Sequence, residues 1–532
     1  MASFAPIDIS QNEFGWGPTE APKLFTDVPY TSFSKGDKLG KAADWTYNQR
    51  WGQRFKKTTD ADDFQVVDNK AQYKTKQFGP RFRGRRRQYE KDTGPEKNSN
   101  QRPQRSRRER EMEARRQGAS HWRKVDNAAM TVYESSVEVK PSWENIEQLD
   151  LKAMMKLKVN SNNIKEPEDV KWCGELPYYN KEYDRVTTRA PKKLQDFQNL
   201  TFHSVTTTDD KVIRGETRTS DANVFATDAV LACIATAPRS VYSWDLVFHR
   251  IGNKLFIDKR EDSQFDFETV NETSHDPPSS AEPEHINSMQ SLSQECTMIN
   301  QNFSQQILRQ DKESLKFPDG NPFKSGNEEP AAVAYRYRKW ILNEDITMLV
   351  RCQLNGVVEP KNEGEDKQYL TCMALNEFDP KVTGVDWKRK IDMQRGAVLA
   401  NELKNNSNKL GRWTARSFLA GADLMQLGFV TRHNPTQKHA HQLLTAPTYK
   451  PREFARQINL DLDNMWGILQ YVITLVQKQP SPGKYVLLKD PNKKVLLLYK
   501  VPMNTFDDDS DSSSEEEEED DDDDDDEDDD DA

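Results

Sequence analysis

The sequence predicts an α+β fold, a single large globular domain in which mixed or antiparallel sheets pack with helices. Gly252-Asn253 separates two apolar runs and is a two-residue hairpin signal. A second hairpin is expected near the end of the domain, turning at residues 490–493. Helical patterns lie between these hairpins, but strands and helices do not alternate regularly. Regular alternation is typical of an α/β fold, so its absence favours α+β.

Apolar periodicity predicts the elements in chain order. A loose helical stripe covers residues 142–157 and includes Trp143, Leu149 and Met154. The predicted strands are 244–251, 254–258, 331–342, 345–354, 369–375, 427–433, 441–449, 484–489 and 494–501. The predicted helices are 394–404, 410–421 and 460–478, and the last has one continuous apolar side.

We place the globular domain at residues 127–506, between two segments that are expected to be disordered. Residues 1–126 form a polar arm with scattered aromatic residues such as Trp16, Trp45 and Trp51, and such a composition cannot close its own core. Aromatic anchors are typical of binding hot spots, so residues 1–60 are expected to dock onto other proteins. Alternatively, these aromatic residues are chance survivors in a linker.

The charge is divided between the two ends of the chain. The formal net charge is −11, yet residues 507–532 contain 21 carboxylates, so the rest of the chain carries +10. Residues 81–124 contain 16 Lys or Arg and 6 Asp or Glu, which accounts for that surplus. The domain is therefore near neutral, and the acidic tail cannot fold. The tail is expected to bind basic partners, to screen the basic arm when RNA is absent, or to accept phosphate at its serines; alternatively it is a solubilising segment.

The arginine-rich part of the arm, residues 78–124, is a candidate for RNA binding. Guanidinium groups neutralise phosphates, and aromatic rings stack on unpaired bases. A nuclear-localisation signal or a solvated charge run is the alternative. The candidate RNA-binding residues are Arg81, Phe82, Arg83, Arg85, Arg86 and Arg87.

The five cysteines are widely spaced and include no Cys-x-x-Cys pair, so we expect buried thiols in a reducing compartment. No apolar run approaches the roughly 20 residues of a membrane span, and the N-terminus lacks a signal-peptide pattern. A cytoplasmic location without a membrane partner is expected.

A polar stretch, residues 261–285, follows the first hairpin and contains Asp276-Pro-Pro278. Unstructured insertions of this length are uncommon in compact domains and often act as lids. The same pattern also fits a tolerated surface insertion.

Four residues raise the possibility of a nuclease. Glu377 and Asp379 follow a predicted strand, and Glu402 and Lys404 lie on a predicted helix. Carboxylates so placed can bridge divalent metals in phosphodiester cleavage. Such short patterns arise by chance in a chain that is 31% charged, so we expect no catalytic residue, no metal site and no cofactor.

Several segments closely resemble the family of the d subunit of eukaryotic translation initiation factor three. They are residues 223–230, 239–245, 299–306, 333–338, 396–406, 461–469 and 488–493. The resemblance implies a non-enzymatic component of a multi-subunit factor that loads messenger RNA onto the small ribosomal subunit. Its arm would dock onto the other subunits, and its domain would bind the methylated guanosine cap of selected messages.

The family's cap-binding positions correspond to six residues here. A methylated guanine is a delocalised cation, which favours a π-face and a nearby negative charge. Tyr242 would supply the first and Asp228 the second, while Gln301 replaces the family's His. The six positions are Asp228, Val241, Tyr242, Thr297, Asn300 and Gln301.

The resemblance also implies that the polar stretch is an RNA gate over the cap site, whose deletion is expected to raise binding of short capped RNA. The gate residues are Phe265, Asp266, Phe267, Glu268, Thr269, Val270, Asn271, Glu272, Thr273, Ser274, His275, Asp276, Pro277 and Pro278.

The family's cap domain is similar in fold to decapping exoribonucleases, which leaves two alternatives open. One is a metal-dependent decapping exoribonuclease, and the other is a purely architectural subunit without cap recognition. The enzyme pattern requires a Glu four residues after a Gly, and Gly356 with Glu359 is one residue short. The incomplete pattern favours binding without cleavage.

Overall fold

The computed structural model of the chain describes residues 133–261, 263–280, 285–310, 313–360, 362 and 366–506. The arm predicted at residues 1–126 and the tail at 507–532 lie outside these ranges. The predicted docking and arginine-rich segments lie there too. The described part is the region predicted as the globular domain.

In the described part, ten strands form the larger sheet. They are β1 Glu144–Asp150, β2 Glu168–Pro177, β5 Val224–Thr227, β6 Asp245–Ile251, β7 Lys254–Asp258, β8 Ser314–Lys316, β10 Ala334–Ile341, β11 Thr347–Leu354, β17 Gly483–Lys489 and β18 Val495–Val501. Their order is β1-β18-β17-β6-β7-β5-β11-β10-β2-β8. The short central strand β5 is parallel to β7 and β11 and is buried along its length, and the other neighbours are antiparallel.

A second sheet contains six strands of the described ranges, and a further pair is separate. The six are β3 Lys192–Lys193, β12 Gly356–Val358, β13 Gln368–Asn376, β14 Leu424–Arg432, β15 His441–Thr445 and β16 Thr448–Tyr449, and the pair is β4 Leu200–Thr201 with β9 Glu329–Pro330. Strands β13 and β14 are parallel. The predicted α+β class with mixed sheets is confirmed.

Helices pack against both sheets. The α-helices are α2 Leu151–Met154, α3 Lys211–Thr219, α4 Asp228–Thr236, α5 Met289–Gln306, α6 Pro380–Thr383, α7 Trp387–Asn405, α8 Ser407–Ala420, α9 Pro451–Gln457 and α10 Leu462–Gln477. Short 3-10 helices are η3 Ser161–Asn163, η4 Lys181–Arg185, η5 Ala237–Arg239 and η6 Gln264–Asp266.

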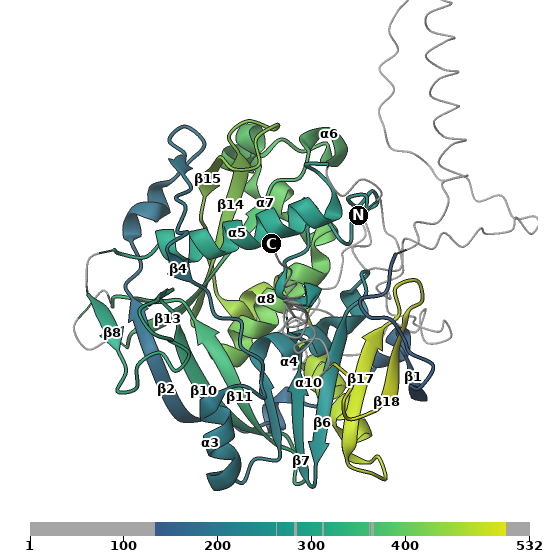
Figure 1. The fold of residues 1–532 in the computed structure, drawn as a ribbon. Coiled ribbons are helices and arrows are strands. Elements are labelled where there is room, and N and C mark those ends of the chain that lie inside the picture. Colours follow the sequence, from purple (N-terminus) through teal and green to yellow (C-terminus); the bar gives the residue numbers. More distant parts are fainter. Residues whose placement is uncertain are drawn as a thin grey trace, which may run out of the picture. The chain divides into compact units, whose positions relative to one another are not determined.

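The main hydrophobic core joins the two sheets through helices α4, α8 and α10, which meet near the centre of Figure 1. Leu246 of the larger sheet, Leu427 of the smaller sheet and Trp466 of α10 all belong to this core. Helix α5 packs on β13 and crosses the front of the second sheet in Figure 1. Helices α4 and α8 thus belong to the core between the sheets, whereas α5 packs on the opposite face of β13.

Most predicted elements are present. The Gly252-Asn253 hairpin is formed by β6 and β7, and Gly252 has the positive φ of 62° that the tight turn requires. Helix α8 begins at Ser407, earlier than predicted, and Gly421 terminates it with φ 65°. Strand and helix predictions elsewhere are correct to within a few residues, except that the predicted helix 394–404 is the second half of α7, which continues from Trp387 through a kink at Gln394.

The helix predicted at residues 142–157 is wrong. Residues Glu144–Asp150 form strand β1, and only Leu151–Met154 are helical. Strand β1 pairs antiparallel with β18 along this length. Hydrogen bonding to the distant strand β18 therefore decides the conformation of these residues. A loose local periodicity contains no information about such a partner.

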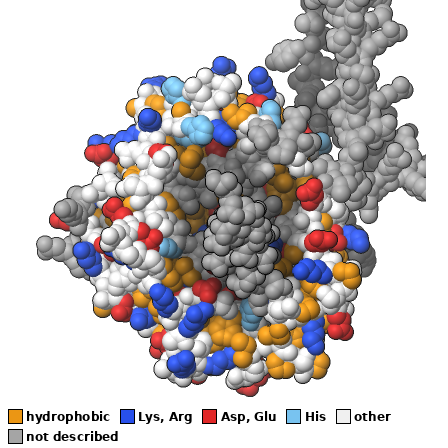
Figure 2. Space-filling model, in the orientation of Figure 1, with side chains coloured by type: hydrophobic (Ala, Val, Ile, Leu, Met, Phe, Trp, Pro, Cys, Tyr) orange, Lys and Arg blue, Asp and Glu red, His pale blue; other side chains and the backbone are white. Residues whose placement is uncertain are grey.

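On the face shown in Figure 2, acidic and basic side chains are interspersed over the described residues. All five cysteines are free and buried, as predicted. Within the described ranges, no helix is both long enough and apolar enough to span a membrane.

Candidate functional site

A cavity of about 510 Å³, lined by both polar and apolar side chains, lies where α4, α5 and α8 approach β11 and the segment after β7. Four of the six positions indicated by the family resemblance line it, namely Asp228, Thr297, Asn300 and Gln301. Val241 and Tyr242 are not among its lining residues. The fold therefore brings α4 and α5 together around one cavity, although they are separated by about fifty residues in the chain.

Asp228 is the first residue of α4, which Thr227 caps by accepting a hydrogen bond from the N–H of Val230. Its side chain is 2% exposed. One carboxylate oxygen accepts a 2.9 Å hydrogen bond from the backbone N–H of Gln353, and the other lies 3.6 Å from Arg416 Nε. The negative charge of Asp228 is therefore already largely engaged by the fold.

The three α5 residues differ in how far the fold uses their side chains. Asn300 bridges to β13, where it exchanges hydrogen bonds of 3.0 and 2.9 Å with the backbone of Ala374. Thr297 Oγ1 accepts a 2.9 Å hydrogen bond from the N–H of Glu268 and donates to Ser293 O. Gln301 is half-buried and lines the cavity. Thr297 and Asn300 thus shape the cavity, whereas Gln301 faces it without a side-chain hydrogen bond to another described residue.

Val241 and Tyr242 contact the predicted gate instead of the cavity. Their backbone N–H groups donate to Oε1 of Glu272 at 2.7 and 3.1 Å. The Tyr242 ring packs edge-on against Tyr133, with the ring centroids 5.2 Å apart. The ring of Tyr242 is therefore packed against another ring, and neither Val241, Tyr242 nor Glu272 lines the cavity.

Part of the predicted gate is firmly packed. Val270, Asn271 and Glu272 are each at most 3% exposed. The N–H of Asn271 donates to Asn406, and Thr273 Oγ1 donates to the carbonyl of Lys404, at the junction of α7 and α8. Residues 269–274 are therefore not a loose surface insertion. Their hydrogen bonds satisfy polar groups of this segment and of the α7–α8 junction.

The first part of the gate forms a wall of the cavity. Phe265, Asp266, Phe267 and Glu268 all line it. Ser293 Oγ donates to the carbonyl of Glu268 at 2.9 Å, so the backbone of Glu268 is held on α5 at both its N–H and its C=O. The polar stretch of the sequence thus has two parts: residues 265–268 form a wall of the cavity, and residues 269–274 are packed into the fold.

Four Lys and Arg side chains of the described residues line the cavity: Lys259, Arg351, Arg412 and Arg416. Lys259 pairs with Asp266, and Arg412 lies 4.9 Å from the centre of the Phe265 ring. Arg412 and Arg416 are four residues apart on α8, so they lie on one face of the helix. The four-residue spacing within the predicted helix 410–421 could have indicated that the two arginines share one helix face. Only the structure shows that this face lines the cavity.

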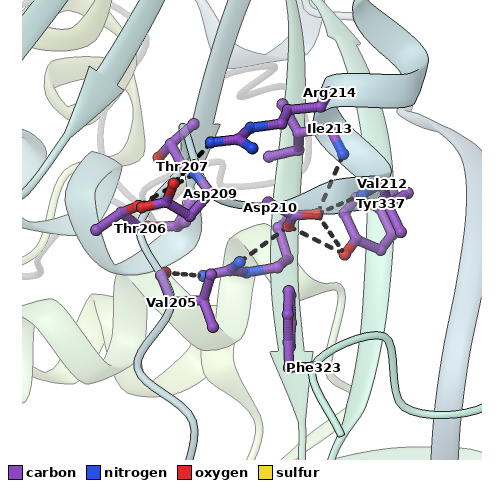
Figure 3. A network of polar contacts seen from close by, with 12 residues as sticks. Val205, Thr206, Thr207, Asp209, Asp210, Val212, Ile213, Arg214, Phe323 and Tyr337 are labelled. Carbon is purple, nitrogen blue, oxygen red and sulfur yellow. Dashed lines mark hydrogen bonds and ion pairs between the residues drawn. The ribbon is translucent and has the colours of Figure 1, made fainter. Parts of the chain in front are cut away.

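Arg351 is held by a buried network. It forms a 2.9 Å ion pair with Asp210, and both side chains are at most 4% exposed. Asp210 also caps α3 through the N–H groups of Val212 and Ile213 and accepts a 3.0 Å hydrogen bond from Tyr337 Oη. Figure 3 shows Asp210 between Tyr337 and the start of α3. This network fixes Arg351 at one corner of the cavity, with its charge balanced by Asp210.

Three of the four residues of the nuclease alternative are held by contacts within the fold, Glu402 among them through a 2.8 Å hydrogen bond from Asn406 Nδ2, whereas Lys404 is exposed. Glu377 accepts hydrogen bonds from the N–H of Trp387 and from Thr431, and Asp379 caps α6. Burial raises the pKa of Glu402 to about 7. No group of three or more His, Cys, Asp or Glu suited to a metal ion occurs among the described residues.

Comparisons with known proteins agree on one family. The family model described as eukaryotic translation initiation factor 3 subunit 7 matches residues 4–500. The D subunit of eukaryotic translation initiation factor 3 from Nasonia vitripennis is 43% identical over 530 residues, covering 95% of this chain and 93% of that protein. The Homo sapiens protein of the same name is 42% identical, covering 95% and 96%.

A comparison with solved structures finds matches of low sequence identity. Rai1 of S. pombe in complex with 3'-FADP, as a triple mutant, is 12% identical with a TM-score of 0.39, and the match covers 67% of this chain and 99% of that one. Scheffersomyces stipitis Rai1, in complex with (3'-NADP)+ and calcium ion, is 13% identical with a TM-score of 0.42, covering 70% and 95%.

Proposed function

The chain belongs to the family of the D subunit of eukaryotic translation initiation factor 3, and on this premise we propose that its cavity binds the methylated guanosine cap of selected messenger RNAs. As a member of that family it is a translation initiation factor and a component of a multi-subunit complex. Cap binding would recruit the bound messages to the small ribosomal subunit.

One observation carries this proposal. Asp228 from α4 and Thr297, Asn300 and Gln301 from α5 converge on a single cavity whose walls also include both cations and carboxylates. A capped RNA end combines a positively charged base with a chain of negative phosphates, so a site for it needs both signs of charge. An ordinary apolar ligand pocket would not require four cations.

The cations suit the phosphates of the cap. Arg412 and Arg416 lie on one face of α8, and a guanidinium group can donate two hydrogen bonds to a phosphate. Arg416 also donates to Gln353 at 3.1 Å, and this bond limits its motion. We assign Arg412 to phosphate binding. Arg416, which also pairs with Asp228, would contact the phosphates and hold Asp228 in place.

The other segments take the roles expected from the sequence. Residues 1–126 would dock onto other subunits and bind RNA through Arg81–Arg87, and residues 265–278 would gate the cavity. Residues 507–532 would form an acidic tail. The protein would act in the cytoplasm. It would not catalyse a reaction, because Glu377 accepts hydrogen bonds from Trp387 and Thr431 and Asp379 caps α6.

A competition experiment tests the function. The full chain would be cross-linked to labelled capped RNA in the presence of free cap analogue, and to the same RNA without a cap. We expect the analogue to reduce cross-linking of capped RNA to the level of uncapped RNA, which the arm alone would bind, and the variants Gln301→Ala and Arg412→Ala to weaken the cap-dependent part. Glu147→Ala is a matched control, since Glu147 lies exposed on β1, outside the cavity lining.

Two results would contradict the proposal. Equal cross-linking of capped and uncapped RNA would favour the purely architectural alternative. Metal-dependent release of the cap from capped RNA, abolished by Glu377→Ala, would favour the decapping alternative.

A further inference from the structure

Four carboxylates of the described residues line the cavity, and three of them are already used by the fold. Asp258 is 1% exposed and accepts hydrogen bonds of 2.7 to 2.8 Å from the hydroxyl of Thr208 and from the backbone N–H groups of Thr207, Thr208 and Lys259. Asp266 pairs with Lys259 and accepts from Ser204. Asp228 is engaged by Arg416 and by a backbone N–H, as described above.

Glu268 is the fourth carboxylate, and its acceptor capacity is largely unused. Its side chain makes one 2.8 Å hydrogen bond, in which Trp413 Nε1 donates to Oε1. No cation among the described residues lies within ion-pair distance of Glu268, and the residue is half-buried at the cavity wall. A carboxylate offers about four acceptor positions, so most of those on Glu268 have no hydrogen-bond donor among the described residues.

Three hydrogen bonds hold Glu268 in place, two at its backbone and one at its carboxylate. Thr297 and Ser293 bind the N–H and C=O of Glu268, and Trp413 binds Oε1. Trp413 itself is 2% exposed and packed in the main core. A side chain fixed in this way loses little rotamer entropy when it binds a ligand.

An aromatic ring lies next to Glu268 in the chain. Phe267 lines the cavity and is 39% exposed, which is unusual for a large apolar side chain in the described part. An exposed ring at the wall of the cavity has an available π-face. Phe265, two residues earlier, lies under Arg412 at 4.9 Å, so its ring is already covered by a cation.

We infer that Glu268 and Phe267 recognise the positively charged, methylated base, with Glu268 accepting from its ring N–H and amino groups and Phe267 stacking on its face. This inference rests on the proposed function and specifies which groups discriminate the methylated from the unmethylated base. The charge needed for that discrimination then comes from the gate segment, and Asp228 serves the framework of the cavity.

The chemistry agrees with the available groups. The guanine edge that carries the amino group presents donors, and a carboxylate accepts two such bonds in parallel. Methylation makes the base cationic, which strengthens both the carboxylate contact and the ring contact. Arg412, which lies over Phe265 and lines the same cavity, would bind the phosphates that follow the base.

The variant Glu268→Gln tests the inference in the full chain. The amide oxygen can still accept from Trp413, so the side chain keeps its shape and loses its charge. The measurement is the dissociation constant of a methylated cap dinucleotide and of its unmethylated counterpart, by competition against labelled capped RNA. We expect the variant to lose roughly ten- to a hundredfold in affinity for the methylated analogue and distinctly less for the unmethylated one, which offers the same donors but no positive charge.

Three further variants keep the result interpretable. Glu268→Asp retains the charge but withdraws it by one methylene, so it should keep part of the preference. Phe267→Ala should weaken binding of the methylated analogue more than that of the unmethylated one, and Glu147→Gln should leave both affinities unchanged. Thermal melting of each variant separates loss of binding from loss of folding.

The outcomes separate the inference from the function. If Glu268→Gln is folded and keeps the full preference for the methylated analogue, the inference is wrong and the cap-binding proposal stands. A wild-type chain that binds both analogues equally would overturn the function and the inference together.

Discussion

The Oε1 atom of Glu272 accepts a 2.7 Å hydrogen bond from the backbone N–H of Val241. This contact joins the predicted gate to the loop before β6, two positions that the family resemblance had associated with the same ligand. Glu272 is 1% exposed and also accepts from Asn408 Nδ2 at 3.0 Å. The carboxylate is thus an anchor of the gate.

Replacement of Glu272 by alanine is expected to loosen this anchor. Several buried donors would lose their acceptor, so the free energy of unfolding should fall by about 1–3 kcal/mol. Association of short capped RNA should become faster, because the wall formed by Phe265–Glu268 would move more readily. Chemical denaturation and stopped-flow binding measure the two effects. Glu344→Ala, at an exposed turn, is the control, and unchanged stability and association rate in Glu272→Ala would contradict the anchor.

Deletion of the whole gate is a less informative experiment. Val270, Asn271 and Glu272 are buried, so the deletion removes part of the packed interior together with the wall. It would also remove Glu268 and Phe267. We therefore expect a deletion variant to lose its preference for methylated over unmethylated cap even if RNA enters more freely.

The buried pair of Asp210 and Arg351 gives a prediction about stability. Replacement of Asp210 by alanine leaves a buried guanidinium without its partner and removes the cap of α3, so the free energy of unfolding should fall by about 3–5 kcal/mol. The double variant Asp210→Ala with Arg351→Met should recover part of that loss. Urea denaturation of the single and double variants measures it, and strictly additive losses would argue against coupling.

Glu402 gives a prediction about pH. Burial raises its pKa from the ordinary 4.5 to about 7, so the folded state binds this proton more tightly than the unfolded chain does. The contribution of Glu402 to stability is therefore fully present below about pH 4.5 and is lost as the pH rises toward about 7. Glu402→Gln should gain up to about 3 kcal/mol relative to wild type between about pH 5 and pH 8. Urea denaturation across this pH range measures the gain, and a difference that does not change with pH would contradict this.

The arginine-rich arm gives a prediction about salt. If about six of its cations contact phosphates, affinity for single-stranded RNA should fall about a thousandfold between roughly 50 and 200 mM salt. A full chain with Arg81, Arg83, Arg85, Arg86 and Arg87 changed to glutamine should show a shallower salt dependence. Phe82→Ala should weaken binding at every salt concentration without altering the slope. Salt-independent binding by the wild type would refute the electrostatic role.

Local patterns predicted the elements that depend on local chemistry. The Gly252-Asn253 turn requires positive φ, and helix α10 has a continuous apolar side that is buried in the core. These features are encoded within one turn or one helical face. Strand β1 was missed because its pairing partner, β18, lies about 350 residues away in the sequence, and no local period records such a partner.

The site was predictable only in part. The resemblance identified positions on α4 and α5 that do line one cavity, Asp228 and Gln301 among them. It did not indicate that Val241 and Tyr242 face Glu272, or that Arg412 lies over Phe265. The hydrogen bonds of a half-buried carboxylate depend on which donors the fold brings within about 3 Å.

The sequence by itself determined the α+β class, the positions of the hairpins and the long helices, the division of charge between the two ends, and the polar character of residues 261–285. Only the tertiary structure decided the roles within that stretch. Glu268 is held by α5 and α8 at the cavity wall, and Glu272, four residues later, is buried against the loop before β6. The physical reason is that the free energy of a carboxylate depends on its exposure and on the donors around it, and these come from segments far apart in the chain.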